Sequence, residues 1–128
     1  MRLKLNVLRV FTENWEASTA FYERVLELPV RFSSPEMGWA EFDVGETSLG
    51  IERVAPEDAE AEDLTGRFVG ASFFTDDIEE TYRILRERGV TFTAPPERQP
   101  WGGMLAHFED PDGNVLTLLG DPDGKADG

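Results

Sequence analysis

Residues 104–119 read Met-Leu-Ala-His-Phe-Glu-Asp-Pro-Asp-Gly-Asn-Val-Leu-Thr-Leu-Leu, with an apolar run on each side of a cluster of turn-forming residues. Pro111 presets the backbone φ for a turn, and Gly113 supplies a positive φ. The carboxylates of Asp110 and Asp112 can accept hydrogen bonds from the backbone just beyond them. The segment therefore predicts a β-hairpin, with an apolar strand leaving the turn directly.

Upstream of this hairpin the chain repeats one pattern of strands and helices. Residues 3–11 alternate as a strand, and a helix over about 15–26 follows before Pro29. Further strands are predicted at 30–33, 39–44, 47–54, 68–75 and 90–93, with a second helix between the last two. The order is β-α-β-β-β twice, in modules 3–54 and 68–119 of one domain. The acidic segment 55–67 is predicted to be a solvated linker, and residues 121–128 a flexible tail.

Both helices carry signals for their caps and their buried faces. The first has Thr12 or Asn14 as its cap, and Trp15 is predicted to be a core residue. Asp76 is predicted to cap the second helix, with Glu79 completing a capping box. The predicted apolar stripes are Ala17, Phe21 and Val25 in the first helix, and Ile78, Tyr82 and Leu85 in the second.

Three segments of the chain together resemble the vicinal oxygen chelate superfamily, which includes glyoxalase I, extradiol dioxygenases, fosfomycin-resistance enzymes and bleomycin-resistance proteins. They are Asn6-Val7-Leu8-Arg9-Val10 followed by Ser18-Thr19-Ala20-Phe21-Tyr22, then Thr75-Asp76-Asp77-Ile78, and the closing hairpin with Trp101-Gly102 upstream. The resemblance implies an α+β fold in which two βαβββ modules form a curved eight-stranded cup with the helices outside. The ligand of such a fold binds in the cup, and the modules are paired within a chain or exchanged between the subunits of a dimer.

The amino-acid composition disfavours some classes of binding partner. With 26 acidic and 12 basic residues the formal charge is −14, which repels nucleic acid and anionic lipid. That acidity is typical of a soluble protein or a salt-tolerant host, and it would also attract a cationic ligand. The chain contains no cysteine, so a disulfide, a thiolate metal site and a cysteine nucleophile are excluded. No charged stretch followed by an apolar run opens the sequence, so we expect a cytoplasmic protein.

Superfamily enzymes hold a divalent metal with two histidines and two glutamates, and the resemblance assigns a position in this chain to each of them. Leu5 and Gly70 stand at the histidine positions, whereas Glu52 and Thr117 stand at the glutamate positions. Leucine and glycine have no ligand atom in their side chains, and one carboxylate beside a hydroxyl is a poor shell. We therefore expect no metal cofactor, although a divalent cation remains the alternative.

Titratable candidates for a site are few. His107 is the single histidine, and if Ala106 and Phe108 face the helices it faces the cup. There it can be a structural residue, a ligand contact, a base, or a partner of Glu52 in a makeshift site. Thr117 lies on the same hairpin.

Aromatic residues define the predicted pocket more clearly. Trp39, Phe74 and Trp101 are expected at cup-facing or rim positions, with Gly38 and Gly102 permitting unusual backbone geometry beside the tryptophans. Core burial is the competing interpretation of both tryptophans. An aromatic wall next to carboxylates favours a planar, partly cationic ligand. The carboxylates that share the phase of Trp39 are Glu41 and Asp43, and Arg9 is placed to pair with Glu52 or with an anionic group of the ligand.

Three functions are consistent with these residues. The first is a homodimeric, metal-independent binding protein of the bleomycin-resistance type, which sequesters an aromatic or partly cationic small molecule. The second is a divergent lyase, isomerase or dioxygenase that uses Glu52 and His107. The third is a regulatory or assembly subunit without a small ligand. Metal content and a co-purifying ligand would discriminate among them.

Overall fold

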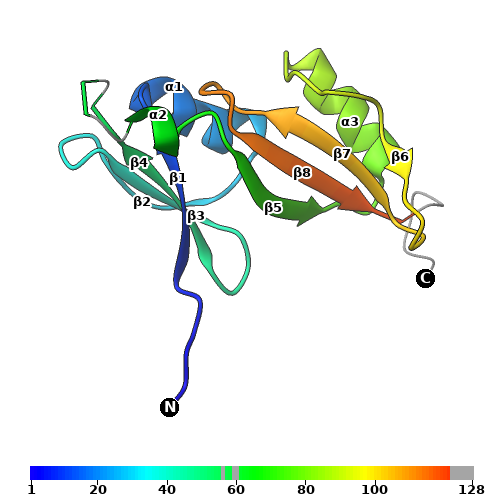
Figure 1. The fold of residues 1–128 in the computed structure, drawn as a ribbon, viewed down its shortest axis with the longest axis horizontal. Helices are drawn as coiled ribbons and strands as arrows, with labels where there is room; N and C mark the ends of the chain where they lie inside the picture. Colours follow the sequence, from blue (N-terminus) through cyan, green and yellow to red (C-terminus); the bar gives the residue numbers. More distant parts are fainter. Residues whose placement is uncertain (56, 59–60, 122–128) are drawn as a thin grey trace. The chain divides into compact units, whose positions relative to one another are not determined.

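The structure, a computed structural model, describes residues 1–55, 57–58 and 61–121. The chain divides into two compact units, Met1–Arg67 with Pro111–Gly113, and Phe68–Asp110 with Asn114–Gly128. Each unit contains one four-stranded sheet (Figure 1). The predicted tail beyond Asp121 and residues 56, 59 and 60 of the predicted linker lie outside the described residues.

The first unit is a βαβββ module in which the first and last strands are neighbours. Its elements are β1 (Val7–Thr12), α1 (Trp15–Ala20), the π-helical η1 (Phe21–Val25), β2 (Val30–Ser34), β3 (Trp39–Asp43) and β4 (Ser48–Arg53). The strand order is β1-β4-β3-β2, with β1 parallel to β4 and the other pairs antiparallel. The short helix α2 (Ala61–Leu64) lies in the segment predicted to be a linker, and Ala61 is buried.

One face of the first sheet is covered by the helix and forms the core. Asn14 caps α1 by accepting a hydrogen bond from the backbone N–H of Ala17, so the second of the two predicted caps is the observed one. The predicted apolar stripe was wrong, because the buried residues are Trp15, Ser18 and Tyr22. Burial of these two large rings removes more apolar surface from water than burial of Ala17 would.

The second unit repeats the topology. Its elements are β5 (Phe68–Phe74), α3 (Ile78–Glu87), β6 (Glu97–Arg98), β7 (Met104–Glu109) and β8 (Val115–Gly120), in the strand order β5-β8-β7-β6. Again the outer strand β5 is parallel to its neighbour β8. Figure 1 shows α3 alongside β7 and β8 of its own unit. None of the helices among the described residues is long and apolar enough to cross a membrane.

Two local predictions in this unit need correction. Asp77, not Asp76, caps α3, and its carboxylate accepts from the backbone N–H of Glu80. The strand predicted at residues 90–93 is only an isolated bridge between Phe92 and Phe108, and the edge strand is Glu97–Arg98 instead. Pro95 and Pro96 lie between these two pieces, and proline has no N–H to continue a ladder.

The predicted hairpin closes the second sheet. Asn114 donates its backbone N–H to Oδ1 of Asp110 at 2.9 Å and its side-chain amide to Oδ2 at 3.0 Å. The backbone N–H of Asp110 in turn donates to the carbonyl of Asn114 at 2.9 Å. Both residues are buried, so these bonds satisfy polar groups that water cannot reach. The turn thus sets the register of β7 against β8.

The helix-facing side of the second sheet contains a chain of aromatic rings. The ring of Phe108 lies 5.7 Å from that of Phe92, which lies 4.7 Å from that of Tyr82 on α3. Ile78 and Leu85 of the predicted stripe are buried beside them. The alternation predicted for β7 is confirmed, since Ala106 and Phe108 are buried and His107 is half-buried on the opposite face.

Replacement of Phe108 by alanine should lower the free energy of unfolding by about 3–5 kcal/mol, because it leaves a cavity in this core. Phe68→Ala is the matched control, since Phe68 is 64% exposed in the same sheet. It should cost less than about 1 kcal/mol. Urea unfolding followed by circular dichroism would measure both, and equal losses would contradict the assigned core.

Candidate functional site

The open face of the first sheet gathers four of the predicted ligand-binding residues. Strand register places Arg9, Gly50 and Glu41 in one row across the sheet, and Phe11, Glu52 and Trp39 in the next row. We call this surface the Trp39 face, defined by Arg9, Trp39, Glu41, Gly50 and Glu52. The prediction that these side chains share one phase follows from the alternation of a pleated strand.

Trp39 is held against the strand beside it. Its indole N–H donates to Oε2 of Glu41 at 3.3 Å. The six-membered part of its ring occupies the space next to Gly50, where an added Cβ would lie 2.8 Å from Cζ2 and 3.0 Å from Cζ3. The side chain is half-buried, so part of the ring remains accessible.

The charges of the Trp39 face are only partly neutralised. Nη1 of Arg9 lies 3.0 Å from Oε1 of Glu52, and the same guanidinium lies over the ring of Phe11. Of the two pairings predicted for Arg9, the one with Glu52 is the one observed. Among the residues that the structure describes, no cation forms an ion pair with Glu41. This carboxylate therefore leaves a local negative charge next to the indole.

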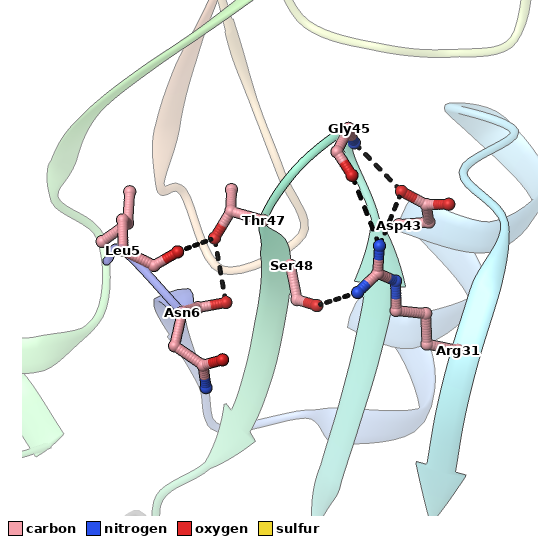
Figure 2. Close-up of polar contacts among 7 residues, drawn as sticks. All are labelled: Leu5, Asn6, Arg31, Asp43, Gly45, Thr47 and Ser48. Atoms are coloured by element: carbon pink, nitrogen blue, oxygen red, sulfur yellow. Dashed lines mark hydrogen bonds and ion pairs between the residues drawn. The ribbon is translucent and has the colours of Figure 1, made fainter. Parts of the chain in front are cut away.

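A second polar cluster lies at the β3–β4 turn (Figure 2). The Arg31 guanidinium donates to Asp43 at 3.1 Å, to Ser48 at 3.2 Å and to the carbonyl of Gly45 at 3.3 Å. The backbone N–H of Gly45 and the guanidinium of Arg31 lower the pKa of Asp43. Asp43 shares the phase of Trp39, as predicted, but it is the last residue of β3 and its carboxylate is bonded to Arg31 and to the turn.

Figure 2 also shows how the first residues of the chain are attached next to this turn. The hydroxyl of Thr47 donates to the backbone carbonyls of both Leu5 and Asn6, at 3.0 and 2.9 Å. The cluster is therefore structural, and it fixes the beginning of β4 beside β1.

The second sheet has an open face of its own. Ser72, Thr117 and His107 form one row across it, and Phe74, Leu119 and Leu105 form the next. Nδ1 of His107 and the hydroxyl of Thr117 are 2.8 Å apart, a hydrogen bond that fixes the plane of the imidazole. The ring of Phe68 meets the imidazole edge-to-face at 5.6 Å.

An open hollow of about 430 Å³ lies at the end of this face. We call it the Trp101 pocket; it is lined by Phe74, Trp101, Gly102, Gly103, Leu119, Gly120 and Asp121. Phe74 is 56% and Trp101 63% exposed, unusual values for such large apolar side chains. Trp101 is thus not a core residue, and it lines this hollow together with Phe74.

The residues at the four metal positions of the superfamily do not fit a divalent ion. Glu52 is already paired with Arg9, and a guanidinium at 3.0 Å opposes a second cation. The hydroxyl of Thr117 is bonded to His107, and Leu5 and Gly70 have no ligand atom in their side chains. In the described parts of the chain, no group of three His, Asp or Glu side chains is arranged to hold a metal.

Sequence reasoning missed the two glycines that lie under the tryptophans. Gly38 and Gly102 do adopt positive φ angles of 65° and 103°, as predicted for the turns beside them. The space for the rings, however, comes from Gly50 and Gly103. The available signal was a glycine inside the predicted strand 47–54, a position that glycine normally weakens.

Comparison with known proteins agrees with this topology. The family model described as Glyoxalase/Bleomycin resistance protein/Dioxygenase superfamily matches residues 4–118. The chain belongs to this superfamily. A solved superfamily member from Sphaerobacter thermophilus DSM 20745 matches with a TM-score of 0.76 at 30% identity, over 94% of this chain and 98% of that one. The predicted resemblance and fold class are therefore confirmed.

Individual superfamily members give further similarities. The chain is 32% identical over 125 residues to the uncharacterized protein YraH of Bacillus subtilis (strain 168), covering 91% of this chain and 97% of that protein. It is 30% identical over 115 residues to a bleomycin resistance protein of Klebsiella pneumoniae, covering 84% and 85%. TnmS3, an antibiotic binding protein from Streptomyces sp. CB03234, has a TM-score of 0.76 at 27% identity, covering 94% and 97%.

Protein purified without chelator should contain substoichiometric divalent metal, because only Glu52 of the four positions supplies a carboxylate and it is paired with Arg9. Elemental mass spectrometry would measure this. One tightly held equivalent of nickel, zinc, manganese or iron that is lost in a Glu52→Gln variant would contradict the prediction, and Glu36→Gln is the control for surface carboxylates.

Proposed function

We propose that this superfamily member is a metal-independent binding protein for a planar, aromatic and partly cationic small molecule. The observation that carries the proposal is the Trp101 pocket, where two large aromatic side chains are exposed around one hollow. Exposure of Phe74 and Trp101 costs free energy in the free protein, because apolar surface remains in water. A ligand that stacks on these rings removes that cost.

Charge next to the rings favours a cation among aromatic ligands. Asp121 lines the Trp101 pocket, and Glu41 lies beside the indole of Trp39. The whole chain carries a formal charge of −14, which raises the local concentration of cations. An aromatic cation therefore gains from stacking, from the quadrupole of the indole and from the neighbouring carboxylates.

Relatives of the chain support a binding role. A bleomycin resistance protein is among its curated relatives, and an antibiotic binding protein is among its structural relatives. Both descriptions concern those proteins, and we extend to this chain only the class of function, sequestration of a small organic molecule.

The enzymatic alternative requires Glu52 and His107 to act on a substrate. Each already has a partner within its own sheet, Arg9 for the carboxylate and Thr117 for Nδ1 of the imidazole. The His107–Thr117 bond does orient the ring, as a general base would need. Recovery of a chemically changed ligand after incubation with the protein would support an enzyme instead of a binder.

Bleomycin and proflavine, a planar tricyclic cation, are the probes for a binding titration followed by tryptophan fluorescence. Binding should quench the emission, and Trp39→Ala and Trp101→Ala should each raise the Kd about two- to thirtyfold, which corresponds to roughly 0.5–2 kcal/mol for one stacking or cation–π contact. Met37→Ala, which removes an exposed apolar side chain outside both sites, is the control. Alanine variants that lose several kcal/mol of stability and keep their affinity would show that the tryptophans are structural.

The contribution of charge is tested separately by Glu41→Gln, which keeps an acceptor for the indole N–H and removes the negative charge. Proflavine affinity should fall at low salt, and the difference from the wild type should shrink as salt rises, because exposed charges are screened over roughly 8 Å at physiological ionic strength. Glu36→Gln, on the β2–β3 turn, is the matched control.

We also propose that the protein is a homodimer. Val30 and Phe32 are 43% and 46% exposed on β2, an outer strand of the first sheet, and outer strands with apolar side chains favour association. Light scattering at micromolar concentration should give twice the chain mass of 14.4 kDa. Phe32→Lys should shift the equilibrium toward the monomer, and a wild-type mass near that of one chain would exclude the dimer.

A further inference from the structure

Each of the two site tryptophans lies over a glycine. The ring of Trp39 occupies the place of a Cβ at Gly50, with Cζ2 at 2.8 Å and Cη2 closer still. The ring of Trp101 does the same at Gly103, with Cε3 at 3.0 Å and Cζ3 and Cη2 closer. In both cases the three nearest atoms belong to the tryptophan alone. The two arrangements occur in different units of the chain.

Backbone conformation does not explain these two glycines. Neither has a φ in the left-handed region, in contrast to Gly38, Gly45 and Gly102. Gly50 lies inside β4, where it pairs with Arg9 on one side and Glu41 on the other. Glycine weakens the interior of a strand, since it adds backbone entropy to the unfolded chain and has no side chain to pack. Glycine at this position has no side chain, and this leaves room for the ring of Trp39.

The surrounding hydrogen bonds prevent the backbone from moving away to make room. Gly50 is in a strand that is paired on both edges, so a shift there would disturb two ladders. At the second position, Gln99 donates its backbone N–H to the carbonyl of Gly103 at 2.8 Å, and Gly102 donates to the carbonyl of Gln99 at 2.9 Å. An added methyl group would therefore displace the ring. For Trp39 the displacement also breaks the bond to Glu41.

We propose that Gly50 and Gly103 are specificity-determining positions, which orient the two indoles by leaving space for their rings. This rests on the proposed function, because the orientation matters through the ligand that stacks on the rings. One face of each indole packs against the backbone at its glycine, Gly50 or Gly103. A ligand therefore stacks on the opposite face of the ring. Each tryptophan therefore selects a flat ring system on its own unit, and it excludes ligands that would bind only if the indole were rotated away from its glycine.

The orientation is tested first without any ligand. In ¹⁵N-labelled protein the three tryptophans give three indole N–H resonances. Gly50→Ala should shift the Trp39 resonance and leave that of Trp101 unchanged, whereas Gly103→Ala should do the reverse. Assignment comes from Trp39→Phe and Trp101→Phe. If Gly50→Ala leaves the Trp39 resonance in place, the ring does not depend on the glycine and the proposal is overturned.

A double-mutant cycle separates this role from general damage to the strand. In the wild-type background Gly50→Ala should lower Tm, because the methyl group meets the ring. In a Trp39→Ala background the same change should leave Tm unchanged or raise it, because the alanine then fills empty space and reduces the entropy of the unfolded chain. An equal fall in both backgrounds would overturn the proposal.

Affinity for proflavine provides the functional readout. Gly50→Ala should weaken binding about as much as Trp39→Ala, two- to thirtyfold, with no further loss when the two are combined. A displaced resonance with unchanged proflavine affinity would overturn the specificity role. If the wild-type protein binds neither proflavine nor bleomycin, the proposed ligand class fails, while the resonance shifts and the Tm cycle still decide whether the glycines orient the rings.

Discussion

Parallel pairing between the first and last strands of each unit is the constraint on which the other features depend. A chain that leaves β1, crosses over through a helix and returns as a meander must place its last strand, β4, next to β1. The same holds for β5 and β8. The crossover helix can then cover only one face of each sheet. The other face stays open, and the side chains at alternate positions on it become available for a ligand.

Much of this could be predicted because it depends on local chemistry. Alternation in β7 correctly separated Phe108 from His107, and the turn residues at 110–114 correctly predicted the hairpin between β7 and β8. The errors arose where packing outweighs local preference. In the first helical segment the large ring of Tyr22 is buried, 6.1 Å from that of Phe42, and the edge strand begins only after Pro95 and Pro96, at Glu97–Arg98.

For the first sheet, strand phase predicted which side chains share a face, and the Arg9–Glu52 pair was one of two predicted alternatives, but the contacts of Trp39 were not predicted. Strand phase placed Trp39, Glu41 and Arg9 on one surface, yet phase contains no information about which side chains cross between strands. The indole of Trp39 reaches past its direct partner, Glu52, to the neighbouring Gly50. Such a diagonal contact depends on rotamers, which one sequence does not reveal. The same limit applies to Asp43, whose carboxylate accepts a hydrogen bond from Arg31 of β2 beside the β3–β4 turn.

The contact between each tryptophan and its glycine also constrains how the sequence can change over time. A side chain at position 50 lowers stability while position 39 keeps its large ring, so substitutions there are favoured in one order, with the loss of the ring first. The reverse order passes through an intermediate in which two groups compete for one space. Related sequences should therefore show positions 39 and 50 changing together, although 10 residues separate them in the chain. The same should hold for positions 101 and 103, which only 1 residue separates.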